Sequence, residues 1–121
     1  MKIFLSVVAI LAWLFGAMLL ISPAKFYEPT GLQLTPLLAT LAQAHGATLV
    51  GLGVINWLSR AVAAAAAVPV LAGNLTVQIL SLGVVLWTAA LGPGAAVSPG
   101  VVIHVVLGSL FAYFLVKARR T

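Results

Sequence analysis

The chain contains no cysteine and almost no acidic residues. Its 121 residues include one carboxylate side chain, Glu28, and six lysines or arginines. Without cysteine there are no disulfides, thiolate metal ligands or thiol nucleophiles. A single carboxylate also excludes the paired acids that serve as general acid and base in many hydrolases. We therefore predict that the protein is not an enzyme and that it has no dedicated metal site.

Charge is scarce and apolar residues are abundant. Charged residues make up 6% of the chain and hydrophobic residues 64%, with a mean hydropathy of +1.25. Soluble domains carry roughly 25% charged residues, so this chain cannot form a conventional water-exposed surface. At ~1.5 Å per residue and ~20 apolar residues per crossing, its length allows four or five membrane helices and no additional domain. The composition predicts an integral membrane protein.

Four apolar segments predict the membrane helices. They run over about 3–21, 36–58, 67–91 and 100–117. The predicted fold class is all-α, an integral membrane four-helix bundle forming a single domain over residues 1–121. The first segment is longer than the ~7 to 15 apolar residues of a signal peptide, which favours an uncleaved helix. We expect residues 22–35 to form a loop, and the Ala- and Val-rich residues 61–68 either to extend the third helix or to cross the interface.

The helix ends carry their own signals. Thr35 can cap the second helix, and Pro36 suits its first position. Gly92, Pro93 and Gly94 are predicted to end the third helix. Four aromatic residues fall near predicted helix ends, as expected at membrane interfaces: Tyr27, Trp57, Trp87 and Tyr113. Trp13 lies in the middle of a helix, so we expect it to face lipid or a neighbouring protein.

The basic residues predict the orientation. If the N-terminus is inside, five basic residues are cytoplasmic and only Lys25 is outside; the five are Lys2, Arg60, Lys117, Arg119 and Arg120. This bias follows the positive-inside rule and places both the N- and C-termini in the cytoplasm. We predict a multi-pass protein of the bacterial cytoplasmic (inner) membrane. The basic residues are spread over helix ends and form no continuous patch, so no nucleic-acid partner is expected.

Small residues recur at helical spacing in three of the four segments. In membranes, such rows of small residues allow neighbouring helix backbones to approach closely. The predicted helix-packing residues are Ala12 and Gly16 in the first segment, Ala42, Gly46 and Gly53 in the second, and Gly108 and Ala112 in the fourth. We predict that the helices pack through these positions.

Polar side chains are few within the segments. Asn74, Gln78 and Ser81 are separated by four and three residues and therefore share one helix face. In hydrocarbon this face must turn inward, and we interpret it as a packing face rather than a transport pathway. Together with Gln43 in the second segment, these residues are the predicted buried polar set.

Two histidines lie at similar predicted depth. His104 is expected about ~6 Å outward of His45, at 1.5 Å per residue. Two such imidazoles could hold a b-type haem, and one alone could hold the magnesium of chlorophyll, so both are candidate cofactor-binding residues. They could instead move a proton or contact a substrate, or form structural hydrogen bonds between helices. We favour the structural interpretation because no acid accompanies them, and we expect no other cofactor.

Several motifs extend over most of the chain. They are LFGAMLLISPAKFYEPTGL, HGATLVGLGVINWLSR, Gly73-Asn74 and the closing LGSLFAYFLVK. With these motifs the chain resembles an uncharacterised family of small bacterial four-transmembrane-helix proteins of about 120 residues. The resemblance implies the same four-helix fold and no particular activity. Gln43 replaces an arginine expected in such proteins, and His45 and His104 are not family features.

The predicted function follows from the absence of reactive groups and from the small-residue faces. We expect a non-catalytic accessory or scaffolding subunit that packs against a larger membrane complex of respiratory or photosynthetic type. Its partners would be the lipid bilayer and other membrane protein subunits. Two alternatives remain open: a small carrier or hydrophobic-ligand-binding membrane protein, and a haem- or chlorophyll-binding protein that uses the histidines.

Overall fold

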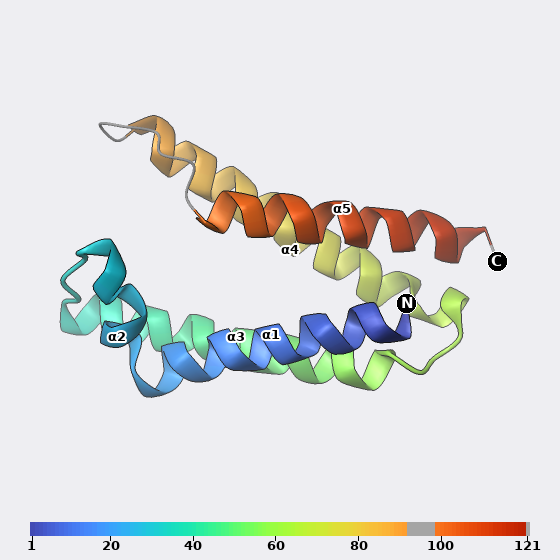
Figure 1. Cartoon of the computed structure of the whole chain (residues 1–121), viewed down its shortest axis with the longest axis horizontal. Coiled ribbons are helices and arrows are strands. Elements are labelled where there is room, and N and C mark those ends of the chain that lie inside the picture. Colours follow the sequence, from blue (N-terminus) through green and yellow to red (C-terminus); the bar gives the residue numbers. More distant parts are fainter. Residues whose placement is uncertain (92–98, 121) are drawn as a thin grey trace. The chain divides into compact units, whose positions relative to one another are not determined.

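The computed structural model describes residues 1–91 and 99–120, and this part of the chain is helical and contains no strand (Figure 1). In chain order the elements are α1 (Lys2–Ile21), α2 (Pro23–Tyr27), the 3₁₀ helix η1 (Glu28–Thr30), α3 (Pro36–Ser59), α4 (Ala64–Leu91) and α5 (Pro99–Arg119). The four long helices lie where the apolar segments predicted them. Each is long and apolar enough to cross a membrane, which indicates a multi-pass membrane protein.

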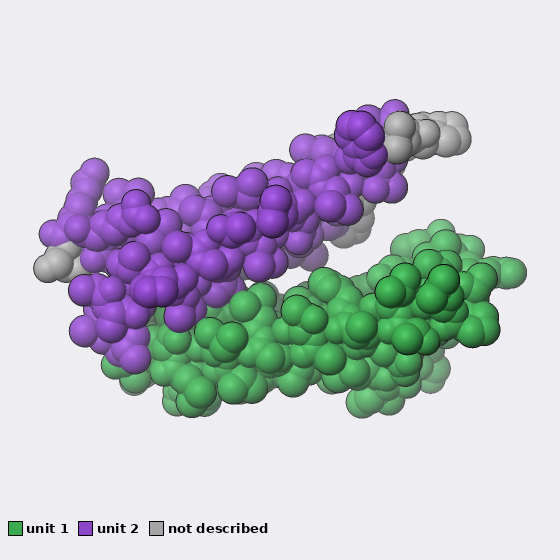
Figure 2. Space-filling view, turned by 180° about the vertical axis from the view of Figure 1, so that it is seen from behind, with its two compact units in different colours: residues 1–61 green, residues 62–121 purple. Residues whose placement is uncertain are grey.

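The described chain divides into two compact units, Met1–Ala61 and Val62–Thr121 (Figure 2). In the first unit α1 packs antiparallel to α3, and in the second α4 packs antiparallel to α5. We call them the first hairpin and the second hairpin and describe each by itself. Each hairpin is built from two helices that lack a strongly polar face, as expected for helices surrounded by lipid.

The connection between α1 and α3 contains helical structure that was not predicted. Residues 22–35 were expected to be a loop, but they include α2 and η1. Pro23 occupies the first turn of α2, where its missing N–H costs no hydrogen bond. The Phe26 ring packs edge-on against Phe15 of α1, with centroids 6.1 Å apart. This contact holds α2 against α1, and Gly31 then ends η1 with a left-handed φ of 70°.

The predicted start of α3 is confirmed. The Thr35 hydroxyl accepts a hydrogen bond from the backbone N–H of Leu38 at 3.3 Å, and Pro36 is the first helical residue. This cap satisfies one of the backbone donors that every helix N-terminus leaves unpaired.

The first hairpin closes where two glycines face each other. A Cβ atom built on Gly16 would lie 2.8 Å from the backbone oxygen of Gly46, and one built on Gly46 would lie 2.7 Å from the oxygen of Gly16. Both distances are shorter than real Cβ contacts. Ala12 and Ala42 are also buried. The backbones of α1 and α3 therefore touch directly, which only small residues permit.

Trp13, which was expected from its position in mid-helix to face lipid or a neighbouring protein, is half-buried and contacts α3. Its indole lies on Gly53 of α3, where a Cβ would come within 2.5 Å of two ring atoms. The ring is also tilted against Trp57, with centroids 5.4 Å apart. Arg60 continues this stack: its guanidinium carbon lies 3.7 Å from the centre of the Trp57 ring, and its Nη1 donates to the Trp57 carbonyl. The missing side chain at Gly53 makes room for the indole.

The second hairpin begins with the Ala- and Val-rich segment. Its residues extend the third predicted helix, since α4 starts at Ala64 and includes Pro69 at an exposed position. The apolar residues buried in this hairpin are Ala67 and Leu71 on α4 and Phe111, Leu115 and Ala118 on α5. The connection predicted around Gly92, Pro93 and Gly94 lies outside the described residues. Compared with the first hairpin, the core of this hairpin contains larger side chains.

Candidate functional site

A polar pair joins the two helices of the second hairpin. His104 of α5 and Gln78 of α4 approach with 2.8 Å between Nδ1 and Oε1. An amide oxygen can only accept, so Nδ1 of His104 carries the hydrogen and donates it. Gln78 is 7% exposed, and His104 is half-buried. We call these two residues the polar pair. It selects one tautomer of the imidazole and fixes the orientation of the amide.

Gln78 of the polar pair belongs to the polar face of α4. Asn74 is 2% exposed, and its side-chain nitrogen donates to the Val70 carbonyl one turn earlier at 2.9 Å. Gln78 lies one turn further along, and Ser81 after it is half-buried. The three residues predicted to share a helix face thus become more exposed along α4, from the buried Asn74 to the half-buried Ser81.

A small hollow opens beside the polar pair. Gln78, His104, Gly108 and Ser109 line it together with the aliphatic side chains of Leu75, Ile79, Leu82 and Val105, and its volume is about 200 Å³. A Cβ built on Gly108 would lie 3.4 Å from the Cβ of Gln78, so any larger side chain there would occupy this space. Ala112, the next small residue on α5, is half-buried. We call this space the α4–α5 hollow.

The other predicted polar residues have different surroundings. Gln43 was expected to be buried, but it is exposed and its side-chain nitrogen donates to the Leu20 carbonyl at 3.1 Å. Its long side chain reaches the end of α1 from the edge of the hairpin. His45 is also exposed. It belongs to the first hairpin and His104 to the second, and each is described within its own unit.

One buried polar residue was missed by the sequence analysis. Asn56 of α3 is 0% exposed. It lies three residues after Gly53 and ten after Gly46, so it shares the face that was predicted to pack. That spacing was the available signal. Ser109, which lines the α4–α5 hollow, was also missed, because a single serine has no distinctive spacing.

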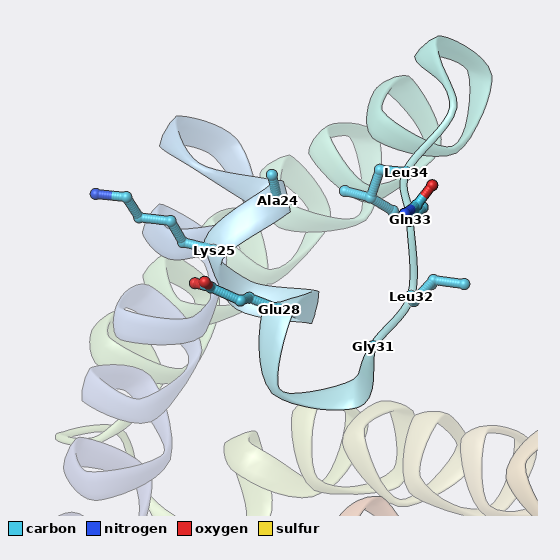
Figure 3. Close-up of a pocket in the computed structure, with 7 residues that line it drawn as sticks. All are labelled: Ala24, Lys25, Glu28, Gly31, Leu32, Gln33 and Leu34. Carbon is cyan, nitrogen blue, oxygen red and sulfur yellow. The ribbon is translucent and has the colours of Figure 1, made fainter.

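The larger hollow lies outside the long helices. It has a volume of about 600 Å³ beside α2 and is lined by Ala24, Lys25, Glu28 and residues 31–34 (Figure 3). In Figure 3 the side chains of Lys25 and Glu28 point to one side and those of Gln33 and Leu34 lie on the other. All of its lining residues except Leu34 are exposed. It is an open depression without a buried polar group.

Within residues 1–91 and 99–120, no three His, Cys, Asp or Glu side chains come close enough together to hold a metal ion. Comparisons with protein-family models, with curated proteins and with solved structures found no match. The α4–α5 hollow with its polar pair is therefore the candidate site on structural grounds alone.

Proposed function

We propose that the chain is a non-catalytic accessory or scaffolding subunit that packs against a larger membrane complex of respiratory or photosynthetic type. Three hydrogen bonds of polar side chains on the long helices support this proposal, because each is made within one hairpin. His104 donates to Gln78, Gln43 donates to the Leu20 carbonyl, and Asn74 donates to the Val70 carbonyl. Their bonds stabilise helix packing rather than arrange reactive groups.

The observation that carries the proposal is a second row of small residues on α3. The face that packs on α1 contains Ala42, Gly46 and Gly53, but small side chains on another face are exposed: Ala44, Ala47, Thr48 and Gly51. A Cβ built on Gly51 meets no atom within 4 Å. Interfaces between membrane helices are enriched in such residues, since they allow close backbone approach. This row therefore suits contact with another helix better than it suits lipid, and we assign that helix to a partner subunit.

The proposal includes one membrane-embedded four-helix bundle in the bacterial inner membrane, with both termini in the cytoplasm. The five-to-one distribution of basic residues supports this orientation. Reporter fusions after Thr121 test it: a cytoplasmic reporter such as green fluorescent protein should fluoresce, and an alkaline phosphatase fusion should be inactive. The opposite pattern would reverse the orientation.

Native purification tests the scaffolding role. A tagged chain extracted from its own membranes in mild detergent should co-purify in fixed stoichiometry with an integral membrane complex. Gly51→Leu should abolish that association and leave the first hairpin folded, because the new side chain points away from α1. Ile55→Leu, a volume-conserving change one turn along the same face, is the matched control and should retain the complex. A wild-type chain that purifies alone would contradict the proposal.

A further inference from the structure

Within the described residues, only one of the two polar atoms in the Gln78 side-chain amide takes part in a hydrogen bond. Its oxygen accepts from His104, and in the part of the chain that the structure describes its nitrogen has no acceptor. Every fully buried polar side-chain atom of the described residues has a partner. The Gln78 nitrogen is therefore an atom that reaches open space, and Gln78 lines the α4–α5 hollow. Gln78 is therefore a 7% exposed lining residue of the hollow with one unpaired donor.

This donor lies near the middle of its helix. The apolar span of α4 runs from Ala64 to Thr88, so its midpoint is two residues before Gln78, about 3 Å away at 1.5 Å per residue. The hydrocarbon core extends about 15 Å on either side of its centre, which places phospholipid ester carbonyls far from this level. An amide hydrogen without an acceptor is costly there. A molecule that dissolves in the bilayer interior can supply an acceptor at this level.

The size of the hollow restricts that molecule further. At about 200 Å³ it is smaller than the ~300 to 1,000 Å³ of typical ligand pockets. It can receive one ring-sized head group, and the remainder of the molecule must lie outside. Leu75, Ile79 and Leu82 form an apolar flank along α4 that an aliphatic tail can follow. The ligand is therefore an apolar molecule with a compact head that carries a hydrogen-bond acceptor.

We propose that the α4–α5 hollow binds the head group of a lipid-soluble quinone, with the Gln78 Nε2–H donating to a quinone carbonyl oxygen. A quinone ring is flat and apolar except for its carbonyls, and its tail keeps it in the bilayer interior. His104 is a positioning residue: its Nδ1–H holds the Gln78 oxygen, which fixes the orientation of the amide beside the hollow. The proposal concerns binding alone and is independent of the scaffolding role.

The test measures binding of decylubiquinone to the purified full-length protein in phosphatidylcholine nanodiscs. Quenching of tryptophan fluorescence, including that of Trp87 nine residues after Gln78, should contain a saturable component above the linear quenching from dissolved quinone. Decylbenzene, which has the same tail and a ring without carbonyls, should not compete. Equal competition by decylbenzene would overturn the role of the Gln78 donor.

Three variants locate the site. Gln78→Leu removes the donor and should raise the Kd about 3- to 15-fold, the range expected for one intramembrane hydrogen bond. Ser109→Leu fills the hollow from α5 and leaves the polar pair in place, and it should weaken binding at least as much. Gln43→Leu removes the exposed amide of the first hairpin and should bind like wild type.

Two further results would overturn the proposal: no saturable component in the wild-type protein, or unchanged binding in both Gln78→Leu and Ser109→Leu. Circular dichroism and gel filtration establish that each variant is folded, and if Gln78→Leu does not fold, Ser109→Leu decides. The purified chain contains no partner subunit. Failure of quinone binding therefore leaves the co-purification result intact, and failure of co-purification leaves this binding test intact.

Discussion

The two hairpins hold their helices together in different ways. In the first, Gly16 and Gly46 bring the backbones of α1 and α3 into direct contact, and Trp13 fills the space above Gly53. In the second, α4 and α5 are joined by the Gln78–His104 hydrogen bond, and the buried side chains include Phe111 and Leu71. The α1–α3 interface of the first hairpin leaves no space between its glycines, whereas the α4–α5 interface of the second leaves a hollow beside the polar pair.

This difference shows two solutions to one physical problem. Lipid tails are as apolar as leucine, so the hydrophobic effect does not drive helices together within a membrane. Close backbone contact stabilises the hairpin through dispersion between many atom pairs. A larger side chain at the contact destabilises the hairpin, because it forces the two backbones apart. A single hydrogen bond contributes little free energy but specifies register. We therefore expect the first hairpin to be sensitive to size and the second to be sensitive to hydrogen-bonding capacity.

The largest effect should come from Gly46→Leu. The new Cβ would lie 2.7 Å from the Gly16 oxygen and 2.9 Å from the Leu19 Cβ, so α1 and α3 must separate. We expect the free energy of unfolding to fall by about 3 kcal/mol, as for severe overpacking. Denaturant unfolding of the purified protein in detergent measures this change. Gly51→Leu, where the added Cβ meets nothing within 4 Å, should leave the stability unchanged. Equal stability of both variants would show that the α1–α3 interface tolerates a large side chain at Gly46.

A smaller effect is expected at His104. His104→Leu leaves the Gln78 oxygen without a donor and should lower the free energy of unfolding by about 0.6 to 1.7 kcal/mol. His104→Gln keeps a donor of similar reach and should cost clearly less. His45→Leu alters an exposed residue of the other hairpin and should have no measurable effect. The same unfolding experiment compares all three variants.

The absorption spectrum decides between this structural role and cofactor ligation by His104. Glutamine does not replace imidazole at the iron of haem or the magnesium of chlorophyll. A Soret band in the purified wild type that disappears in His104→Gln would therefore contradict the structural role. A ligation role for His45 would show itself by the same loss in His45→Gln.

The smallest effect should come from Arg60→Gln. The guanidinium covers the Trp57 ring at the end of α3, where both side chains are half-buried, and a cation–π contact that is still reached by solvent contributes about 0.5 to 1 kcal/mol. Tryptophan emission should also shift, because the ring loses this cover. Arg119→Gln, at the exposed end of α5, is the matched control and should change neither quantity. A loss above 2 kcal/mol would mean that the hydrogen bond from Arg60 to the Trp57 carbonyl contributes more than the ring contact.

Many features of the fold could be predicted because they depend on local composition. The four long helices follow from apolar segment length, and the Thr35 cap follows from a hydroxyl directly before a proline-started helix. The short helix α2 could not be predicted in this way. Five residues are too few to form a stable helix in isolation, and the contact between Phe26 and Phe15 that holds α2 in place joins separate elements.

The site illustrates the same limit. Spacing placed Asn74 and Gln78 on one face of α4, but only the antiparallel register of α4 and α5 places His104 opposite Gln78. Gln43 has the same functional group as Gln78, yet it bonds to a carbonyl at the exposed edge of the first hairpin. Trp13 is directed to α3 by the missing side chain of Gly53. Each outcome depends on which residue of a neighbouring helix lies opposite.

The sequence by itself determined that the chain forms four long apolar helices, because transfer into lipid depends on the summed hydropathy of each segment. It also determined where small and polar residues share a helix face, because helical periodicity is local. Only the tertiary structure decided that α1 pairs with α3 through facing glycines and that α4 pairs with α5 through the polar pair. The physical reason is that apolar surfaces of lipid-facing helices are nearly equivalent, so the partner is selected by close packing and hydrogen bonds that exist only once the helices meet.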